Sequence, residues 1–405
     1  MADRGRVTSH KSGSRLAGVD GLRAVAALWV VLFHVRAFSG VHDLPVPGLD
    51  FLLRSGSTGV SLFLVISGFC LYAPFAGGRL NRFNTSSFLL RRCRRLLPAY
   101  YTALAAGVLL TLVGAGWLGF SHLSLREVGW QVVTHLTLTQ TFFPTTFYAI
   151  NGAYWSLGLE WQLYFALPLL IIAIRRFGLG RTLCAAILCN VVYRLGLEVV
   201  IHVGFIRAGT VLATVVLPNQ LPGRCGEFVL GVLAAELYAT GRVRIWARYL
   251  RLSFVALVPA SIILAGRPLS HLLFGGVFFA LLCVVLAEDN VVSRALSWRP
   301  LVGVGVMSYS LYLVHQPLIQ AVAYSMHSYA SMSGGESFVA LVLLLPVVVF
   351  VAWILFISVE RWTLSSRSDP LQQLWIHAIR GTRRANPENR RLTSATLESS
   401  PRESR

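Results

Sequence analysis

The sequence predicts an all-α, polytopic membrane protein with about ten transmembrane helices and with both termini in the cytoplasm. Three observations lead to this fold class. Of the 405 residues, 55% are hydrophobic and only 13% are charged, which is too apolar a balance for a water-soluble protein. Many apolar residues fall into runs of about 20, the length that crosses the hydrocarbon region of a bilayer. Basic residues gather in short segments between these runs, as the positive-inside rule requires.

The apolar runs define the expected spans. They cover residues 17–38, 58–76, 96–118, 155–174, 183–203, 223–240, 252–266, 270–287, 302–325 and 338–359. The run 252–266 is the shortest of them. The segment 128–150 is apolar in places but is interrupted by Thr and Pro, so we expect a loop or a half-buried re-entrant segment there.

The distribution of charge tests this count independently. With the N-terminus inside, the external segments contain only Arg36, Arg54, Arg126, Arg207, Arg224 and Arg267. All other arginine-rich segments, including those near both ends of the chain, are then cytoplasmic. Two ends on the same side require an even number of spans, and ten spans meet this requirement. We expect a bacterial cell membrane of the inner-membrane type. The lipid bilayer is then the surrounding partner.

Three parts of the chain follow from this pattern. Residues 1–16 form a basic cytoplasmic segment, residues 17–362 the transmembrane domain, and residues 363–405 a polar, Arg-rich tail that we expect to be disordered. The first apolar run is long, contains Arg23 and lacks a small-x-small cleavage site. We therefore expect a retained first span rather than a signal peptide.

Composition also argues against two classes of partner. The net charge of +19 would suggest nucleic acid for a soluble domain, but here membrane orientation accounts for the arginines, and we expect no nucleic-acid partner. The six cysteines lie in or beside apolar runs without metal-ligand spacing. We expect them to be small buried hydrophobic residues, and we expect no metal site.

The first span, LRAVAALWVVLFHV, contains two ionisable residues, Arg23 and His34. Ionisable groups inside a span are costly and are candidates for a functional site. Their spacing places them on nearly the same helix face, about 20° apart, and about 16 Å apart along the axis. In the alternative interpretation, Arg23 is an anchor that reaches the interface, and His34 is a core histidine bonded to a backbone carbonyl.

A second candidate stretch is NGAYWSLGLEWQLYF, which contains Glu160 one to two turns inside the membrane. We expect Glu160 and His34 to lie at similar depth. A carboxylate there could orient the imidazole, as paired acid–base groups do in acyl transfer. Alternatively, Glu160 pairs with Arg224 or with water. We expect these polar groups to surround a cavity between the helices, and Trp155 and Tyr164 of this stretch are candidates for lining it.

The third candidate stretch is RRCRRLLPAYY, in which Arg91, Arg92, Arg94 and Arg95 occupy four of five positions. Anchoring at the cytoplasmic surface accounts for arginines here but does not require this density. Guanidinium groups bind phosphates well. The cluster therefore indicates a docking site for an anionic donor such as coenzyme A.

A further stretch, MSYSLYLVHQP, places Tyr309, Tyr312 and His315 on one span. The two tyrosines are candidates for lining the same cavity. His315 either lines that cavity too or is a buried structural histidine.

Together these stretches resemble the membrane acyltransferase family 3, which includes bacterial O-antigen acetylases and macrolide O-acyltransferases. The matching pieces are GLRAVAALWVVLFH, GVSLFLVISGF, RRCRRLLP, YWSLGLEWQLYF, the Phe228–Gly231 part of GEFVLGVL, and SYSLYLVHQPL. They occur in the family's order and cover residues 17 to about 360.

The resemblance implies transfer of an acyl group, usually acetyl, from cytosolic acyl-CoA to a hydroxyl group, often on a sugar. It implies roles for Arg23, His34, Arg92 and Arg95, and it places Glu160 at the acidic position of its motif. Acyl-CoA, with acetyl-CoA as the expected form, would be a co-substrate rather than a bound cofactor. Some members have a soluble hydrolase-like extension, whereas this chain has a short basic tail.

The hypothesis is therefore a membrane O-acyltransferase in which His34 and Glu160 are catalytic. Arg23, Arg92 and Arg95, helped by Arg91 and Arg94, would bind the donor. Nearly all basic residues are Arg, which is typical of a high-GC genome and makes a glycosylated natural product an alternative acceptor to a surface polysaccharide. The alternative function is a transporter or flippase of lipid-linked sugars, for which the intramembrane charges would form a path.

Overall fold

The structure is a computed structural model that describes residues 8–44, 46–113, 124–287, 290–329 and 332–364. Within these ranges every regular element is helical, and no strand occurs. The all-α prediction is thus confirmed for the described part of the chain. The predicted cytoplasmic ends and most of the predicted disordered tail fall on residues 1–7 and 365–405, outside the described residues.

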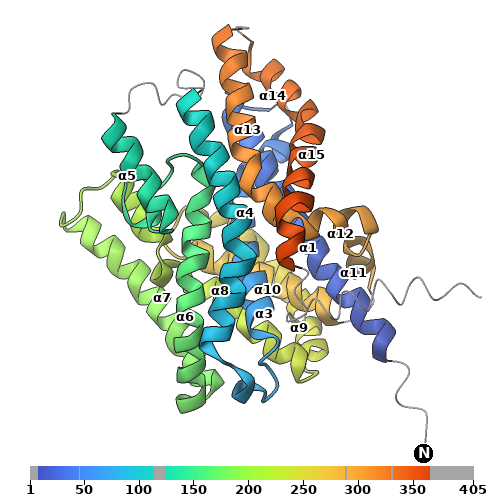
Figure 1. The fold of residues 1–405 in the computed structure, drawn as a ribbon. Coiled ribbons are helices and arrows are strands. Elements are labelled where there is room, and N and C mark those ends of the chain that lie inside the picture. Colours follow the sequence, from blue (N-terminus) through green and yellow to red (C-terminus); the bar gives the residue numbers. More distant parts are fainter. Residues whose placement is uncertain (1–7, 45, 114–123, 288–289, 330–331, 365–405) are drawn as a thin grey trace, which may run out of the picture.

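Most of the longer helices coincide with the predicted apolar runs, but a helix over Leu125–Leu136 overlaps the segment 128–150, where a loop or a half-buried re-entrant segment was expected. Figure 1 shows the arrangement of the helices. The longer ones are α1 (Thr8–Phe38), α3 (Gly59–Tyr72), α4 (Thr85–Val113), α5 (Leu125–Leu136), α6 (Trp155–Phe177), α7 (Leu179–His202), α8 (Leu221–Ala239), α9 (Val243–Ile263), α10 (Ser270–Ala287), α13 (Ser308–Tyr329), α14 (Gly334–Leu343) and α15 (Leu345–Leu355). The shorter α-helices are α2 (Pro47–Arg54), α11 (Val291–Leu296), α12 (Arg299–Val306) and α16 (Arg361–Leu364). Single turns of 3₁₀ or π-helix are η1 (Ser55–Thr58), η2 (Leu80–Arg82), η3 (Gln140–Phe142), η4 (Gly152–Tyr154), η5 (Leu212–Val216), η6 (Leu217–Asn219) and η7 (Phe356–Glu360).

The number of membrane spans differs from the prediction. Six described helical segments are long and apolar enough to cross a membrane, and a seventh results if two parts of α9, bent by 62°, form one span. The six are Ala17–Phe38, Gly48–Tyr72, Gly152–Phe177, Leu179–His202, Ser270–Ala287 and Leu345–Thr363. The count of ten is therefore not confirmed. Two of the predicted runs are broken: 302–325 is divided between α12 and α13, and 338–359 between α14, α15 and η7.

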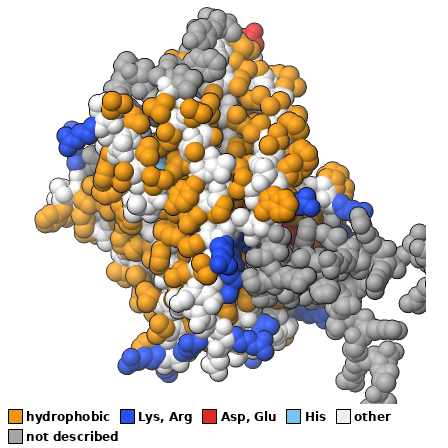
Figure 2. Space-filling view, viewed as in Figure 1, with side chains coloured by type: hydrophobic (Ala, Val, Ile, Leu, Met, Phe, Trp, Pro, Cys, Tyr) orange, Lys and Arg blue, Asp and Glu red, His pale blue; other side chains and the backbone are white. Residues whose placement is uncertain are grey.

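The outer surface suits a lipid environment. Hydrophobic side chains cover most of the face shown in Figure 2, and many of the basic side chains on it lie towards the lower end of the view. Helix α7 is the clearest case, because only 11% of its most apolar window is buried inside the protein. Burial in lipid rather than in a protein core explains such a helix, which is apolar on nearly all sides.

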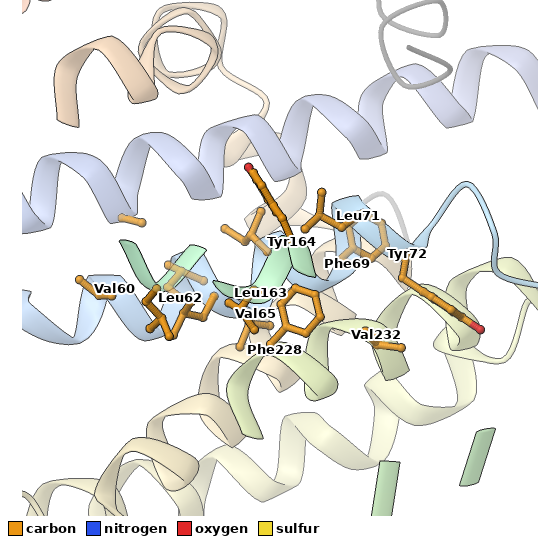
Figure 3. Packing of buried hydrophobic residues seen from close by; sticks show 14 of the residues in the cluster. Val60, Leu62, Val65, Phe69, Leu71, Tyr72, Leu163, Tyr164, Phe228 and Val232 are labelled. Atoms are coloured by element: carbon orange, nitrogen blue, oxygen red, sulfur yellow. The ribbon is translucent and has the colours of Figure 1, made fainter. Parts of the chain in front are cut away.

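The centre of the bundle is the close pair α3 and α8. A Cβ atom at Gly68 would lie 2.0 Å from the carbonyl oxygen of Phe228, and one at Gly231 would lie 2.0 Å from that of Val65. Only glycine permits this approach of two backbones, as at many helix contacts in membranes. Figure 3 shows the side chains of Val65 and Phe69 on α3 beside Phe228 and Val232 of α8.

Helix α1 is held in a similar way against α11 and α12. A Cβ atom at Gly21 would lie 1.9 Å from the carbonyl oxygen of Leu296, and one at Gly305 would lie 1.9 Å from that of Asp20. These contacts fix the N-terminal half of the predicted first span. They thereby fix the position of Arg23 on the same helix.

Candidate active site

A cavity of about 120 Å³ lies among α1, α3, α4, α6 and α13. Its apolar wall includes Phe63 and Leu64 of α3. Its polar lining residues are Arg23, Ser67, Arg92, Arg95, Ser156, Glu160, Tyr164, Ser308, Tyr309 and Tyr312. The structure thus brings together three of the arginines, the carboxylate and three of the tyrosines that the sequence singled out.

The arginine cluster of α4 is divided between two faces. Arg92 and Arg95 line the cavity, whereas Arg91 and Arg94 are not among its lining residues. The spacing explains the division, because residues three apart lie on one face of a helix and neighbours lie about 100° away. The guanidinium carbon of Arg92 also lies 5.8 Å from the centre of the Phe88 ring. The predicted donor-binding set is therefore placed at this cavity only in part.

Glu160 lies in the cavity wall, but its partner differs from the one expected. Its Oε1 accepts a hydrogen bond of 2.8 Å from the hydroxyl of Tyr164, one turn along α6. The structure gives no hydrogen bond between Glu160 and His34. Arg224, the alternative partner, forms its ion pair with Glu227, at 2.9 Å.

The tyrosines of α13 connect this helix to its neighbours. The Tyr309 hydroxyl donates to the carbonyl oxygen of Leu96 in α4 at 2.9 Å. The Tyr312 hydroxyl is 2.7 Å from that of Ser156 and 3.1 Å from the carbonyl oxygen of Ala153. Tyr309 and Tyr312 therefore line the cavity in fixed positions.

A proline in α13 explains why this helix is joined to the start of α6. Pro317 has no N–H, so the carbonyl of Leu313 has no partner at i+4 in its own helix. That oxygen instead accepts from Asn151 Nδ2 at 3.0 Å and from the Tyr154 hydroxyl at 3.3 Å. Two of the stretches noted in the sequence, NGAYW and LVHQP, are thus coupled through one carbonyl group.

His34 lies beside a second histidine rather than in the cavity wall. His34 Nδ1 is 2.8 Å from the carbonyl oxygen of Val30 and 3.3 Å from Nε2 of His315. His315 is fully buried, and its ring centre is 5.4 Å from that of Tyr312. Tyr312 therefore stands between the cavity and the histidine pair. The sequence left open whether His315 lines the cavity; it is not among the lining residues.

Trp155 is not among the lining residues of the cavity either. Its ring stacks on Phe147, with the centres 5.8 Å apart, and the Arg224 guanidinium lies over the ring, 5.7 Å from its centre. A cation prefers the face of an indole ring. The expectation of a cavity-lining role for Trp155 is therefore corrected to packing against Arg224.

The structure also reveals a buried carboxylate, Glu360, that was not among the predicted site residues. Glu360 is buried, and its Oε2 accepts from the backbone N–H of Ser310 at 3.1 Å and from the Ser310 hydroxyl at 2.5 Å. It thus satisfies the first turn of α13, where a negative charge is favourable. It also interacts electrostatically with Arg95 and Arg23. Its position directly after the predicted run 338–359, at the end of an apolar helix, was the available signal.

No group of three or more His, Cys, Asp or Glu side chains that could hold a metal ion occurs among the described residues. The absence of a metal from the reaction stays a prediction. So does acyl-CoA as co-substrate, and the roles assigned to individual residues are likewise predictions.

Comparison with known proteins places this arrangement in context. A family model described as an acyltransferase domain, the acyltransferase 3 model, matches residues 16–357. The O-acetyltransferase OatA of Staphylococcus aureus is 24% identical over 335 residues, which cover 78% of this chain and 52% of OatA. YrhL of Bacillus subtilis, whose name assigns it to peptidoglycan O-acetylation, is 26% identical over 345 residues, or 75% of this chain and 48% of YrhL.

A third relative comes from an animal. The regulator of hypoxia-inducible factor 1 of Caenorhabditis elegans is 30% identical over 207 residues, covering 45% of this chain and 40% of that protein. The chain spans about half the length of the curated bacterial relatives that it matches. No solved structure matches it. The family match does not favour the alternative of a transporter or flippase.

Proposed function

Because the chain belongs to the acyltransferase 3 family, we propose that it is a membrane O-acyltransferase. It transfers an acetyl group from acetyl-CoA to a hydroxyl group of a carbohydrate or of a glycosylated natural product. The names of OatA and YrhL support an acetyl group and an oxygen acceptor. The acceptor class, the donor and the location in a bacterial plasma membrane belong to this proposal.

One observation carries the proposal: a single cavity gathers Arg23, Arg92 and Arg95, and its lining residue Tyr312 lies against the pair formed by His315 and the half-buried His34. Three guanidinium groups suit the phosphates of coenzyme A. Arg92 and Arg95 would hold these phosphates at the arginine-rich end of α4. The pantetheine arm would pass Arg23 on its way to Tyr312.

The proposed reaction uses His34 as the general base. His34 Nε2 removes the proton from the acceptor hydroxyl while that oxygen attacks the carbonyl carbon of the thioester. The C–O bond forms, the C–S bond breaks, and the leaving thiolate of coenzyme A takes the proton from the imidazolium of His34. A positioned base of this kind typically contributes about 10² to 10⁴ in rate.

The position of His34 sets a requirement for the donor. Phe63 and Tyr312 line the cavity and lie against each other, with ring centres 5.9 Å apart. The thioester must pass these two rings to reach His34. In this proposal the acceptor approaches His34 from the opposite side, so the two substrates meet at the histidine.

The proposal is tested with purified protein and acetyl-CoA labelled in the acetyl group. The acceptor is first found by mass spectrometry of glycolipids, polysaccharides and small metabolites from cells with and without the gene, as a missing acetyl group. We expect His34→Ala to reduce transfer to this acceptor by at least about 100-fold, the lower end of general-base effects.

His135→Ala is the matched control. His135 is a buried histidine that, like His34, lies against the carbonyl oxygen of residue i−4, here Gln131 at 2.7 Å, but it does not line the cavity. We expect this variant to keep wild-type transfer. Activity of His34→Ala within about tenfold of the wild type would exclude His34 as the base. Absence of acetyl transfer by the wild-type protein would exclude the function.

A further inference from the structure

We infer that His315 is the positioning residue of His34 and, together with the carbonyl oxygen of Val30, fixes the proton of His34 on Nδ1, so that Nε2 is the basic atom. This inference rests on the proposed function for its catalytic meaning. Its structural content, the tautomer of the His34 ring, is independent of any activity. Neither the sequence motifs nor the cavity assigned such a role to His315.

The two rings are held in contact from two different helices. Their centres are 4.9 Å apart, with an angle of 66° between the ring planes. His34 is also flanked by Phe33, with ring centres 5.1 Å apart, and by Phe38, with ring centres 6.0 Å apart. His315 is fully buried on α13. These neighbours restrict rotation of both imidazoles.

The proton of His315 follows from its backbone contacts. Its Nδ1 lies 2.9 Å from the carbonyl oxygen of Tyr312 and 3.2 Å from that of Leu311. A carbonyl oxygen only accepts, so Nδ1 must carry the proton. A neutral imidazole has one N–H, and Nε2 of His315 is therefore an acceptor. That acceptor faces His34 Nδ1 at 3.3 Å.

The proton of His34 follows in the same way. Its Nδ1 lies 2.8 Å from the carbonyl oxygen of Val30 and next to the acceptor nitrogen of His315. Both neighbours require a donor, so Nδ1 carries the proton and Nε2 holds the lone pair. The structure gives Nε2 of His34 no hydrogen bond to a described residue. Nε2 is thus the atom that can accept a proton from a substrate.

The same contact assists the charged state. When Nε2 of His34 gains a proton, the positive charge is shared with the Nδ1–H group, which still points at the lone pair of His315. A hydrogen bond from a charged donor is stronger than one between neutral groups. His315 therefore does what the sequence hypothesis expected of Glu160. It orients the base and stabilises the imidazolium.

Two substitutions separate this role from simple packing. His315→Gln keeps an acceptor oxygen near the position of Nε2, whereas His315→Phe keeps the ring but removes the acceptor. We expect kcat of His315→Phe to fall about 100-fold, as for a misplaced catalytic group, with little change in KM for acetyl-CoA. We expect His315→Gln to stay within about tenfold of the wild type, because orientation is retained. His135→Phe is the control for loss of a buried histidine and should keep wild-type kcat.

A measurement without turnover tests the tautomer directly. In protein labelled with ¹⁵N in histidine, the wild-type His34 should show a protonated Nδ1 and an unprotonated Nε2, with the signal assigned by its loss in His34→Gln. His315→Phe leaves only the carbonyl oxygen of Val30 to hold the Nδ1 proton, so a larger fraction of His34 should carry its proton on Nε2 than in the wild type. A wild-type His34 that is protonated on Nε2 overturns the inference, even if the enzyme is active. Equal kcat values for His315→Gln and His315→Phe also overturn it. If His315→Phe does not fold, the ring of His315 in the wild type decides: the inference requires its Nε2 to be unprotonated, and a protonated Nε2 overturns it. Absence of acetyl transfer in the wild type refutes the proposed function and leaves this result unaffected.

Discussion

Four neighbouring arginines of α4 show how much a single residue step changes a side chain's surroundings. Arg92 and Arg95 line the cavity, and Arg91 and Arg94 do not, although all four lie within five positions of one helix. Orientation in the membrane requires basic residues here without regard to face. A donor site requires them on one face. The two explanations therefore make different predictions for the two pairs.

We expect Arg92→Ala and Arg95→Ala each to raise KM for acetyl-CoA by about tenfold or more, the effect of losing a hydrogen bond to a charged group. Arg91→Ala and Arg94→Ala should leave KM nearly unchanged. Steady-state kinetics of the four variants, compared at equal amounts of folded protein, check this prediction. Equal increases in all four would mean that the cluster acts through general charge rather than as a binding site.

The sequence could predict features of the site that lie within one helix, but it could not predict which helices lie side by side. The family resemblance singled out Arg92 and Arg95, and helix periodicity places these two on one face. Glu160 was recognisable as a carboxylate inside a predicted span. The partner of His34 was not recognisable, because Glu160 and His315 both lie in predicted spans. No local pattern shows which helix is adjacent to α1. The packing of α1 against α13 decides it in favour of His315.

At the scale of the element, apolar runs predicted the positions of the helices well but not their breaks. The run 302–325 looks continuous, yet it is divided at Met307. The preceding helix α12 lies with Gly305 directly against the backbone of Asp20 in α1. Tertiary contacts of this kind override a hydropathy pattern, which contains no information about neighbouring helices. The pattern also could not show that α9 bends by 62°.

The glycines of α3 and α8 allow a direct test of element packing. In Gly68→Ala and Gly231→Ala, the new Cβ would lie 2.0 Å from a backbone oxygen of the other helix, so the helices must separate. We expect a clearly lower thermal transition for both variants, since overpacking typically costs about 1–3 kcal/mol.

Gly276→Ala in α10 is the matched control for these two variants. A Cβ there meets no atom within 4 Å, and alanine favours a helix over glycine by about 1 kcal/mol. We expect an unchanged or slightly higher transition temperature, measured in the same detergent. A loss equal to that of Gly231→Ala would show that the effect comes from the helix backbone and not from the contact.

At the scale of the whole molecule, a buried ionic network joins three helices away from the cavity. Arg224 and Glu227 of α8 form an ion pair at 2.9 Å, with side chains only 3% and 1% exposed. The Ser61 hydroxyl of α3 donates to Glu227 at 2.9 Å, and Nδ1 of His271 in α10 lies 3.1 Å from Arg224. An arginine only donates, so His271 must accept at Nδ1. The network therefore fixes the relative positions of α3, α8 and α10.

The stability of the bundle should depend on whether both partners of the Arg224–Glu227 pair are present or both are replaced, and not on the presence of charge itself. Glu227→Leu leaves the buried guanidinium of Arg224 without its counter-charge, and breaking a buried pair typically costs about 3–5 kcal/mol. The double variant Arg224→Met with Glu227→Leu removes both charges and should recover much of that loss, because replacing both partners by apolar groups is often neutral.

Asp43→Asn is the control. Asp43 forms an ion pair with Arg54 at 2.7 Å, and the two side chains are 83% and 50% exposed. Exposed pairs contribute about 0–1 kcal/mol. Thermal unfolding of the three variants in one detergent gives the order of stability. If the double variant is no more stable than Glu227→Leu, the network holds the helices through its hydrogen bonds to Ser61 and His271, and charge balance is not what keeps the three helices together.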